Sequence, residues 1–529
     1  MNDSFDYVIV GAGSAGCALA NRLTEDPNVT VCLLEAGGSH RHWSVWVPGA
    51  LLWNMLTKKR NWAFETVPQK GLNGRKGYQP RGKVLGGSSA LNAMIYIRGH
   101  AEDYNEWQKL GCEGWSYEDV LPYFKKSEHR EVGADEYHGT GGELNVAPLR
   151  SPGSINQRFL EACDELQIPR NPDFNGASQE GVGFYEVTHK NGERWSTARA
   201  FLDPIEDRPN LTVMTGTLTE KILLEGKRAV GVRYRAGKRR AEAKAKREVI
   251  LSAGAFGSPQ LLLLSGIGPK DKLDPHGISQ LHDLPGVGEN LQDHPDYVLS
   301  YDSDLADNIG ISVRGAIRMI GEFFRYRSDR KGMLSSNFAE SGGFIYVDRS
   351  EPSPDIQFVF VRSVVDDHGR KLHWGNGYSL HITVIRPKSR GSLWLNSADP
   401  SAPPSIDPAF LEDERDMHKL LQGVKKAQQI LRGKAFDDVR GKPFYAADSD
   451  DDDLLRADIR NRADTQYHPV GTCKMGNDAM AVVDSKLRVF GIEGLRVADA
   501  SIMPNVVSGN TNAPSIMIGE RAADFIKEA

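Results

Sequence analysis

Short apolar runs and one helical pattern follow one another at the start of the chain. Tyr7 to Val10 and Thr30 to Leu34 are continuous, largely apolar runs. Such runs are typical of strands buried on both faces of a parallel sheet. Between them, Cys17 to Leu23 has helical spacing with small residues on its inner face. The order strand, helix, strand predicts a βαβ unit and places the chain in the α/β class.

Further strands are expected in the middle of the chain. Leu211 to Met214, Lys221 to Leu224, Ala229 to Arg235 and Glu248 to Leu251 alternate or run apolar, which indicates strands. The basic run Lys238 to Arg247 lies between the last two. We expect this run to be the solvated tip of a hairpin, because nothing in its pattern singles out nucleic-acid binding.

The character of the chain changes from Pro295 to about Arg462. Helical patterns such as Arg415 to Leu431 alternate there with strands such as Ile356 to Val361 and Leu380 to Ile385. This pattern predicts a second domain built of a sheet and helices, so that the fold is α+β overall.

The first strand leads into the turn Gly11-Ala12-Gly13-Ser14-Ala15-Gly16. This GxGxxG spacing opens a helix, where backbone N–H groups and the helix dipole favour a pyrophosphate. Glu35 ends the second strand, where an acid can accept hydrogen bonds from ribose hydroxyls. The unit therefore predicts a dinucleotide site, and the acid argues against a 2′-phosphate. At this point both FAD and NAD are possible.

Composition narrows the class of protein. The 529 residues are 40% hydrophobic and 26% charged, as in a globular protein, and are enough for at least two domains. A net charge of −5 gives no reason to expect nucleic acid. Five scattered cysteines without a CxxC pair suit a reducing compartment and predict neither disulfides nor a metal site. With no signal peptide expected and no run long enough to span a membrane, we expect a cytoplasmic protein.

A second turn of the phosphate-binding type follows Pro80. The stretch Arg81 to Met94 reads RGKVLGGSSALNAM, a glycine pair with two serines before an expected helical run. Backbone N–H groups in such a turn can bind phosphate or a flavin edge, although Ser88 or Ser89 would also suit a helix N-cap. Two turns of this kind favour a long cofactor with a central pyrophosphate, and hence FAD.

These motifs together resemble the glucose–methanol–choline (GMC) oxidoreductases. RGKVLGGSSALNAM is similar to the first family signature, and GAFGSPQLLLLSGIG at 254–268 to the second. YHPVGTCKMG at 467–476 and GNTNAP at 509–514 are similar to the C-terminal motifs. The motifs occur in the family's order, so the resemblance spans essentially the whole chain.

The resemblance implies a Rossmann-like FAD-binding domain and a substrate-binding domain of mixed sheet and helices. We expect the FAD domain to be discontinuous, at 1–155, 195–295 and 465–529, with the substrate cap at 156–194 and 296–464. Family positions imply cofactor contacts at Gly11, Gly13, Ser14, Ala15, Gly16, Glu35, Ala36, Trp62, Arg81, Gly82, Val84, Gly86, Gly87, Ser88, Asn92, Ala93, Met94, Ile95, Leu218, Ala253, Gly254, Tyr467, Asp499, Ala500, Asn510, Asn512, Ala513 and Pro514.

The resemblance also implies the catalytic residues, His468 and Asn512. Oxidation of an alcohol requires loss of the hydroxyl proton, and histidine, with an ordinary pKa of about 6.5, suits that task. An asparagine can hydrogen-bond the developing alkoxide. Some family members attach FAD through a histidine that corresponds to Leu91. Leucine cannot form that bond, so we expect noncovalent FAD.

The whole-chain pattern most resembles bacterial dehydrogenases of aliphatic alcohols and polyethylene glycol, with choline dehydrogenases close behind. It implies oxidation of a primary alcohol with electrons passed to a quinone-type acceptor. Three alternatives on this fold stay open: choline oxidation, an oxygen-using alcohol oxidase, and a hydroxynitrile lyase that keeps FAD as a relic. A fourth alternative, an NAD-dependent enzyme, would use only the N-terminal motif, and the second glycine turn and the C-terminal motifs argue against it.

One segment raises the possibility of membrane contact. Ile311 to Met333 mixes apolar residues with several arginines. A basic amphipathic helix of this kind can lie on a membrane surface, or it can be a surface helix with one packed face. Peripheral contact with the inner membrane is therefore a hypothesis at this stage.

Overall fold

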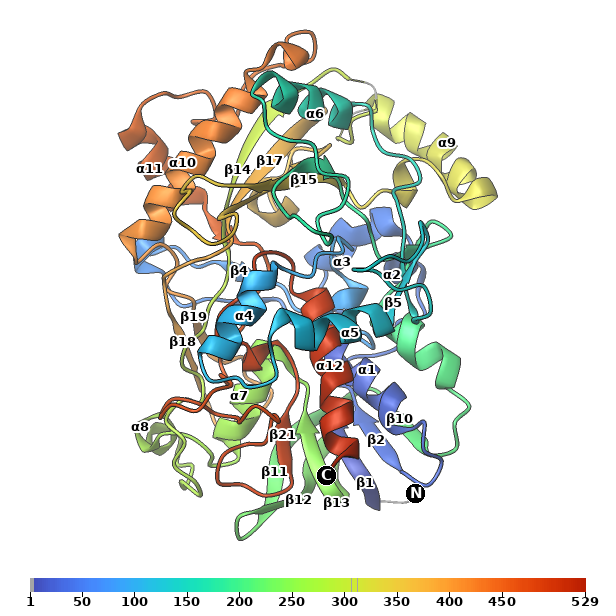
Figure 1. Cartoon of the computed structure of the whole chain (residues 1–529), viewed down its shortest axis with the longest axis vertical. Coiled ribbons are helices and arrows are strands. Elements are labelled where there is room, and N and C mark those ends of the chain that lie inside the picture. Colours follow the sequence, from blue (N-terminus) through green and yellow to red (C-terminus); the bar gives the residue numbers. More distant parts are fainter. Residues whose placement is uncertain (1–3, 306, 312) are drawn as a thin grey trace.

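The computed structural model describes residues 4–305, 307–311 and 313–529. Figure 1 shows two halves, each built around its own sheet, stacked along the long axis of the molecule. The predicted α/β class with a Rossmann-like first half is confirmed by this arrangement.

The first sheet holds the predicted βαβ unit. β1 (Ser4–Val10) pairs in parallel with β2 (Val31–Leu34), and α1 (Ser14–Leu23) connects them. All four residues of β2 and the last four of β1 are buried, as continuous apolar runs predict. The strand order is β10-β2-β1-β13-β12-β11, and β21 pairs with β13. The other strands are β10 (Leu211–Met214), β11 (Thr217–Glu225), β12 (Arg228–Ala236), β13 (Arg239–Leu251) and β21 (Leu495–Val497).

The basic run Lys238 to Arg247 is not a hairpin tip, and that prediction was wrong. Nearly all of it belongs to β13, which pairs antiparallel with β12 from Arg239 onward. Lys244 and Lys246 are exposed and alternate with buried Ala243 and Ala245. The period of two puts the charges on the solvent face of a strand whose other face packs on the core.

The second sheet is antiparallel throughout and lies in the other half. Its order is β20-β14-β17-β16-β15-β7, and α10 (Glu414–Leu431) and α6 (Ile155–Glu165) pack near it. Its strands come from the segments expected for the cap, except that Pro295 at the start of β14 and Thr465 at the end of β20 each lie one residue outside them. The exact domain boundaries stay a prediction. The strands are β7 (Gly181–Phe184), β14 (Pro295–Asp302), β15 (Ala339–Ile345), β16 (Ile356–Val361), β17 (Gly377–Val384) and β20 (Asp464–Thr465).

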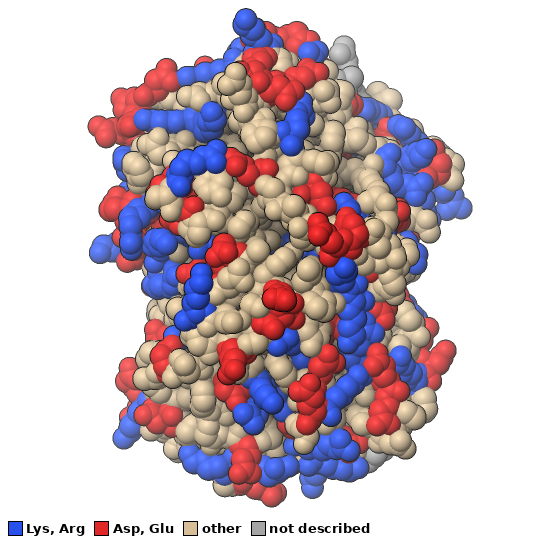
Figure 2. All heavy atoms as spheres, in the orientation of Figure 1, with Lys and Arg blue, Asp and Glu red and all other residues tan. Residues whose placement is uncertain are grey.

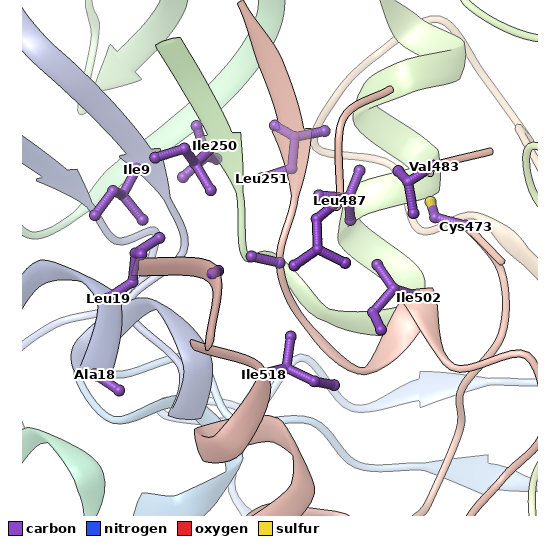
Figure 3. Close-up of a cluster of buried hydrophobic side chains, with 14 of the residues drawn as sticks. Ile9, Ala18, Leu19, Ile250, Leu251, Cys473, Val483, Leu487, Ile502 and Ile518 are labelled. Carbon is purple, nitrogen blue, oxygen red and sulfur yellow. The ribbon is translucent and has the colours of Figure 1, made fainter. Parts of the chain in front are cut away.

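The core of the first half contains both ends of the chain. α12 (Asn512–Lys527) packs against α1, so closely that a Cβ on Gly519 would stand 2.4 Å from the Ala15 carbonyl oxygen. Figure 3 shows Ile9 and Leu19 in one buried cluster with Ile250, Ile502 and Ile518. Other helices of this half include α4 (Ala101–Lys109), α5 (Tyr117–Ser127), α7 (Gly254–Leu264) and α8 (Lys270–Leu273).

The cysteines and the helices bear on the expectations about disulfides and membrane spans. All five cysteines are buried and free of disulfides. Among the helices of the described ranges, none combines the length and apolarity needed to cross a bilayer.

Candidate active site

A cavity of about 550 Å³ is lined by residues of both halves of the molecule. It brings together most of the residues that the family motifs single out. The predicted site residues that line it are Gly11, Gly13, Ser14, Ala15, Glu35, Ala36, Trp62, Arg81, Gly82, Gly87, Ser88, Asn92, Ala93, Met94, Ile95, Leu218, Ala253, Gly254, Tyr467, His468, Asp499, Ala500, Asn510 and Asn512. The residues that the motifs single out therefore line one continuous cavity, and their roles stay a prediction.

The two glycine turns lie directly against each other at one end of this cavity, which we call the cofactor end. The Gly86 N–H donates to the Ala12 carbonyl oxygen at 2.8 Å. A Cβ on Gly87 would stand 2.7 Å from Cα of Gly13, so the two backbones can approach this closely only because Gly87 lacks a side chain. The backbone groups of both turns are thus available to one ligand at one place.

The helical run expected after the second turn does not form. The chain makes only a short 3₁₀ helix at Gly87–Ala90, with Gly86 rather than a serine before it and no side-chain cap. Ile95 then bridges to Val187, and the Tyr96 N–H donates to the carbonyl of Glu186 at 3.0 Å, which holds the backbone extended. The backbone N–H groups of the glycine turn can therefore bind a ligand here, but no α-helix follows to add its dipole.

Two buried acids line the cofactor end. Glu35 accepts hydrogen bonds from the backbone N–H groups of Ala12 (3.1 Å) and Gly37 (2.7 Å), and burial raises its pKa to about 7. Asp499 accepts from the Gly254 N–H at 2.8 Å and from Ser501 N–H at 2.8 Å. Burial raises the pKa of Asp499 as well. Asp499 therefore both caps the following turn and faces the cavity.

Five predicted cofactor contacts do not line the cavity. Gly16 packs on the turn instead, since a Cβ there would stand 2.0 Å from the Gly11 carbonyl oxygen. Val84 is fully buried, and Gly86 bonds to the first turn. Ala513 and Pro514 lie inside the first turn of α12. These five residues pack against the residues that line the cavity.

His468 lies at the other end, which we call the reactive end. Its backbone N–H donates to Asp293 Oδ1 at 2.9 Å. Its Nδ1 lies 3.0 Å from Nδ1 of His294, and its Nε2 lies 3.1 Å from Nδ2 of Asn510. Burial, followed by the influence of His294 and Arg81, holds the pKa of His468 well below its usual range. The imidazole is therefore neutral near pH 7 and can accept a proton.

The two asparagines of the GNTNAP motif face different partners. Asn510 contacts His468, and Gln357 Nε2 donates to Asn510 Oδ1 at 3.3 Å. Asn512 instead accepts a hydrogen bond from Ser14 Oγ at 2.7 Å, at the beginning of α12. The structure thus brings Asn510, and not Asn512, into contact with the histidine.

Three residues of the reactive end were missed by the sequence reasoning. Asp293 and His294 lie just before β14, in a stretch to which the sequence pattern assigned no chemistry. His294 is fully buried, with its pKa lowered to about 3 by that burial. Gln357 lies in β16. No local pattern marks these residues, because they meet His468 only through the fold.

The rest of the reactive end is largely apolar, although the lining also includes polar side chains, namely Asn337, Ser363, His368, Lys371, His373 and His381. α3 (Leu51–Leu56), the start of β15, β16 and the segment 364–372 supply hydrocarbon side chains there. Among the described residues that line the cavity, the carboxylates are Glu35 and Asp499, both at the cofactor end. The apolar lining residues of the reactive end are Leu51, Leu52, Met55, Leu56, Ile309, Ile311, Phe338, Ala339, Val359, Val361, Val364, Val365 and Leu372.

These features fit an extended dinucleotide. Side-chain-free backbone at Gly13 and Gly87 leaves room for a pyrophosphate, and the cavity continues from there to His468. The buried hydroxyl of Thr219, next to Leu218 in the lining, has no partner within the described protein and can bond a ligand. The residues present therefore suit a cofactor whose reactive part lies beside His468.

Comparison with known proteins agrees with this geometry. Two models of the GMC oxidoreductase family match residues 5–296 and 387–519. An alcohol dehydrogenase [acceptor] of Pseudomonas putida is 48% identical over 99% of this chain and 95% of its own length. A mitochondrial choline dehydrogenase of Mus musculus is 45% identical over 99% of this chain and 90% of its own.

Solved structures show the same fold over the whole chain. Pyridoxine 4-oxidase from Mesorbium loti has a TM-score of 0.90 at 31% identity, covering 99% of both chains. A formate oxidase has a TM-score of 0.91 at 27% identity, covering 99% of this chain and 98% of its own. With both family models matched and relatives aligned from end to end, this chain belongs to the GMC oxidoreductases, FAD-binding enzymes that act on CH–OH groups.

Proposed function

We propose that the protein oxidises an uncharged primary alcohol to its aldehyde, with His468 as the base that removes the hydroxyl proton. The observation that carries this proposal is a neutral, buried imidazole in the cavity, with Nε2 held beside Asn510. Bound FAD would supply the hydride acceptor for the carbinol hydrogen. The cofactor-end residues Gly13, Glu35, Gly87 and Asp499 would hold it there.

The histidine pair supports one tautomer of His468. Both imidazoles have lowered pKa values and are neutral, so one Nδ1 must donate to the other. His294 Nε2 faces the backbone carbonyls of Ile385 and Val507, although no hydrogen bond of ordinary geometry joins it to either. Those carbonyls favour a proton on Nε2, which leaves His294 Nδ1 as the acceptor. His468 then donates from Nδ1 and carries its lone pair on Nε2, where Asn510 Nδ2 donates to it until an alcohol hydroxyl takes that place.

Asn510 takes the role that the sequence reasoning gave to Asn512. With Gln357 donating to its Oδ1, the Asn510 amide is oriented so that Nδ2 donates toward His468 Nε2 and the space beside it. An amide N–H placed there can hydrogen-bond the alcohol oxygen as it loses its proton. Asn512 begins α12 beside the turn that contains Ser14, where the helix dipole favours negative charge.

The apolar lining supports an aliphatic or aromatic alcohol over choline. A trimethylammonium group calls for an aromatic cage and is helped by a nearby acid. The described lining of the reactive end is mostly hydrocarbon, includes the cation Lys371 and holds no carboxylate. Burying an apolar chain there gains about 0.8 kcal/mol per methylene group, whereas a cation would be desolvated without compensation.

Noncovalent FAD and a quinone-type acceptor complete the proposal. Leu91 lines the cavity at the position of the family's attachment histidine, and its hydrocarbon side chain cannot form the bond. Release of all flavin into the supernatant after acid precipitation would support this, and flavin retained on the precipitate would contradict it. The Pseudomonas putida relative is named for an electron acceptor without saying which, and a quinone would fill that role.

Anaerobic reduction of the flavin tests the function directly. The holoenzyme is mixed without oxygen with 1-octanol, benzyl alcohol or choline, and the flavin absorbance is followed. We expect bleaching by the first two and slow or no bleaching by choline. Bleaching by choline alone would establish the alternative substrate. Aldehyde with stoichiometric peroxide in air would identify an oxidase, and product without any flavin reduction would identify a lyase.

A further inference from the structure

Helix α9 (Val313–Asp329) turns its apolar side away from the protein. Ile317, Ile320 and Phe324 lie on one helical face and are 67%, 62% and 64% exposed. The opposite face holds Glu322 and Tyr326, which are buried; Glu322 accepts from the Met333 N–H at 2.6 Å, and Tyr326 donates to the Gly192 carbonyl at 3.2 Å. A surface helix of a globular domain has the reverse arrangement, with its apolar face inward.

The loop after the short 3₁₀ helix η8 (Asp367–Gly369) continues this apolar surface. The Gly375 N–H donates to the Ile311 carbonyl at 2.9 Å, so the loop lies against the chain that leads into α9. Trp374 is 73% exposed, and Leu372 and Ile311 are also exposed. We call the exposed apolar residues of α9 together with Ile311, Leu372 and Trp374 the α9 patch.

The α9 patch reaches the cavity. Ile311 and Leu372 line it, as does Leu56 at the end of α3, and all three are exposed on their outer side. A Cβ on Gly369 would stand 3.2 Å from the side chain of Leu52, which places α3 beside the same loop. The opening of the cavity is thus bordered by exposed apolar side chains that are continuous with the patch.

Positive charge surrounds the patch. Residues 311–331 carry six Lys or Arg against two acids, one of them the buried Glu322, although the whole chain has a net charge of −5. Beyond the end of α3 and Thr57, the chain continues with three basic residues, Lys58, Lys59 and Arg60. Figure 2 shows Lys and Arg side chains gathered over α9. Charges of this sign match an anionic lipid surface.

We propose that the α9 patch lies in the interface of an anionic lipid bilayer and that the cavity opens toward the lipid. Ile320 and Phe324 would enter the acyl boundary while Arg318 and Arg327 pair with lipid phosphates. A lipophilic alcohol and a lipophilic acceptor then reach the flavin without crossing water. The evidence for lipid docking is the α9 patch and the charges around it. The delivery of substrate from the lipid rests on the proposed function.

Vesicle flotation of the holoenzyme tests the docking without an activity measurement. Vesicles of neutral phosphatidylcholine and vesicles with about one third phosphatidylglycerol are compared at low and high salt. We expect at least tenfold more protein bound to the anionic vesicles at low salt, and a loss of that difference at high salt. No binding to anionic vesicles at low salt would overturn the proposal.

Variants locate the surface and separate lipid from protein partners. Ile320→Ser with Phe324→Ser should lower vesicle binding at least fivefold, whereas Leu454→Ser, at an exposed apolar site on α11 (Asp452–Arg462), should leave it unchanged. Equal loss in both would overturn the assignment to the α9 patch. Sedimentation velocity without lipid tests for a protein partner. A dimer that the α9 substitutions dissociate would show that the patch is an interface between copies of the chain, and would overturn the lipid proposal. Reduction of the flavin by benzyl alcohol in solution should be unchanged in all variants, so a failure of the proposed function is visible separately.

Discussion

The two ends of the cavity are built in different ways. At the cofactor end, Gly13 and Gly87 present backbone from two turns, and the acids Glu35 and Asp499 are held by backbone N–H groups. At the reactive end, a chain of side chains runs from His294 through His468 to Asn510 and Gln357. The cofactor end is therefore suited to binding and the reactive end to moving a proton, so substitutions at the two ends should change different quantities.

The largest effect is expected from His468→Ala. Removing the base should lower turnover about 10²–10⁴-fold, because the hydroxyl proton then has no positioned acceptor. FAD content, measured by absorbance of the purified protein, should stay at the wild-type level, since the cofactor end is untouched. Turnover within twofold of wild type would remove His468 from the mechanism.

Asn510→Ala and Asn512→Ala form a matched pair two residues apart. Asn510→Ala should lower turnover about 10²-fold, as expected when one hydrogen-bond donor to a developing oxyanion is lost. Asn512→Ala loses the hydrogen bond from Ser14 and should weaken FAD binding while turnover at saturating FAD changes little. The opposite outcome in steady-state kinetics and FAD titration would restore the catalytic role to Asn512.

His294→Leu should lower turnover about tenfold. The substitution leaves the Nδ1–H of His468 without an acceptor, which costs the free energy of about one hydrogen bond and frees the other tautomer. His294→Asn offers an amide oxygen in the same place and should restore most of the rate. A loss that is equal in both variants, with unchanged thermal unfolding, would contradict the positioning role.

Glu35→Gln should act on cofactor affinity and not on rate. The amide keeps only one acceptor oxygen for the N–H groups of Ala12 and Gly37, so FAD should bind roughly fivefold more weakly. Turnover at saturating FAD should equal that of the wild type. A change in turnover with unchanged affinity would show that the two ends are coupled more closely than the hydrogen bonds suggest.

The smallest effect is on stability below neutral pH. His294 has a pKa of about 3 when folded, against about 6.5 when unfolded, so below pH 6.5 the unfolded chain binds the extra proton. The free energy of unfolding therefore falls as pH decreases, by about 0.8 kcal/mol for this group between pH 8 and pH 6. Denaturant titrations of wild type and His294→Asn at both pH values should differ by that amount. Identical pH dependence would contradict a neutral, buried His294.

The same contrast explains what the sequence could predict. The turn at Gly11–Gly16 and Glu35 form one βαβ unit, so their spacing alone indicated a dinucleotide site, and four ordered motifs identified the family. The helix expected after Ser89 was wrong because pairing of Ile95 and Tyr96 with residues 186–187 overrides the local preference.

The reactive end could be predicted only in part. His468 was found through the family motif, but its partner His294 is 174 residues away in the chain and carries no local signal. Asn510 and Asn512 are two asparagines of one short motif, and the sequence alone does not distinguish them. The path of the backbone into α12 decides which of them faces the histidine. Likewise, amphipathic spacing in α9 was visible, whereas the direction of its apolar face depends on where Glu322 and Tyr326 are anchored.

The shared core of the two chain ends has a consequence for biosynthesis. β21, which pairs with β13, and α12, which packs on α1, are translated long after β1 and α1. At about 5–20 residues per second, the N-terminal glycine turn would wait roughly 20–90 s for His468 and its surroundings to be translated. During that time the face of α1 that packs on α12 is uncovered, which leaves apolar surface exposed on the nascent chain. A stop codon that removes only α12 should therefore produce an aggregated chain and not merely an inactive enzyme.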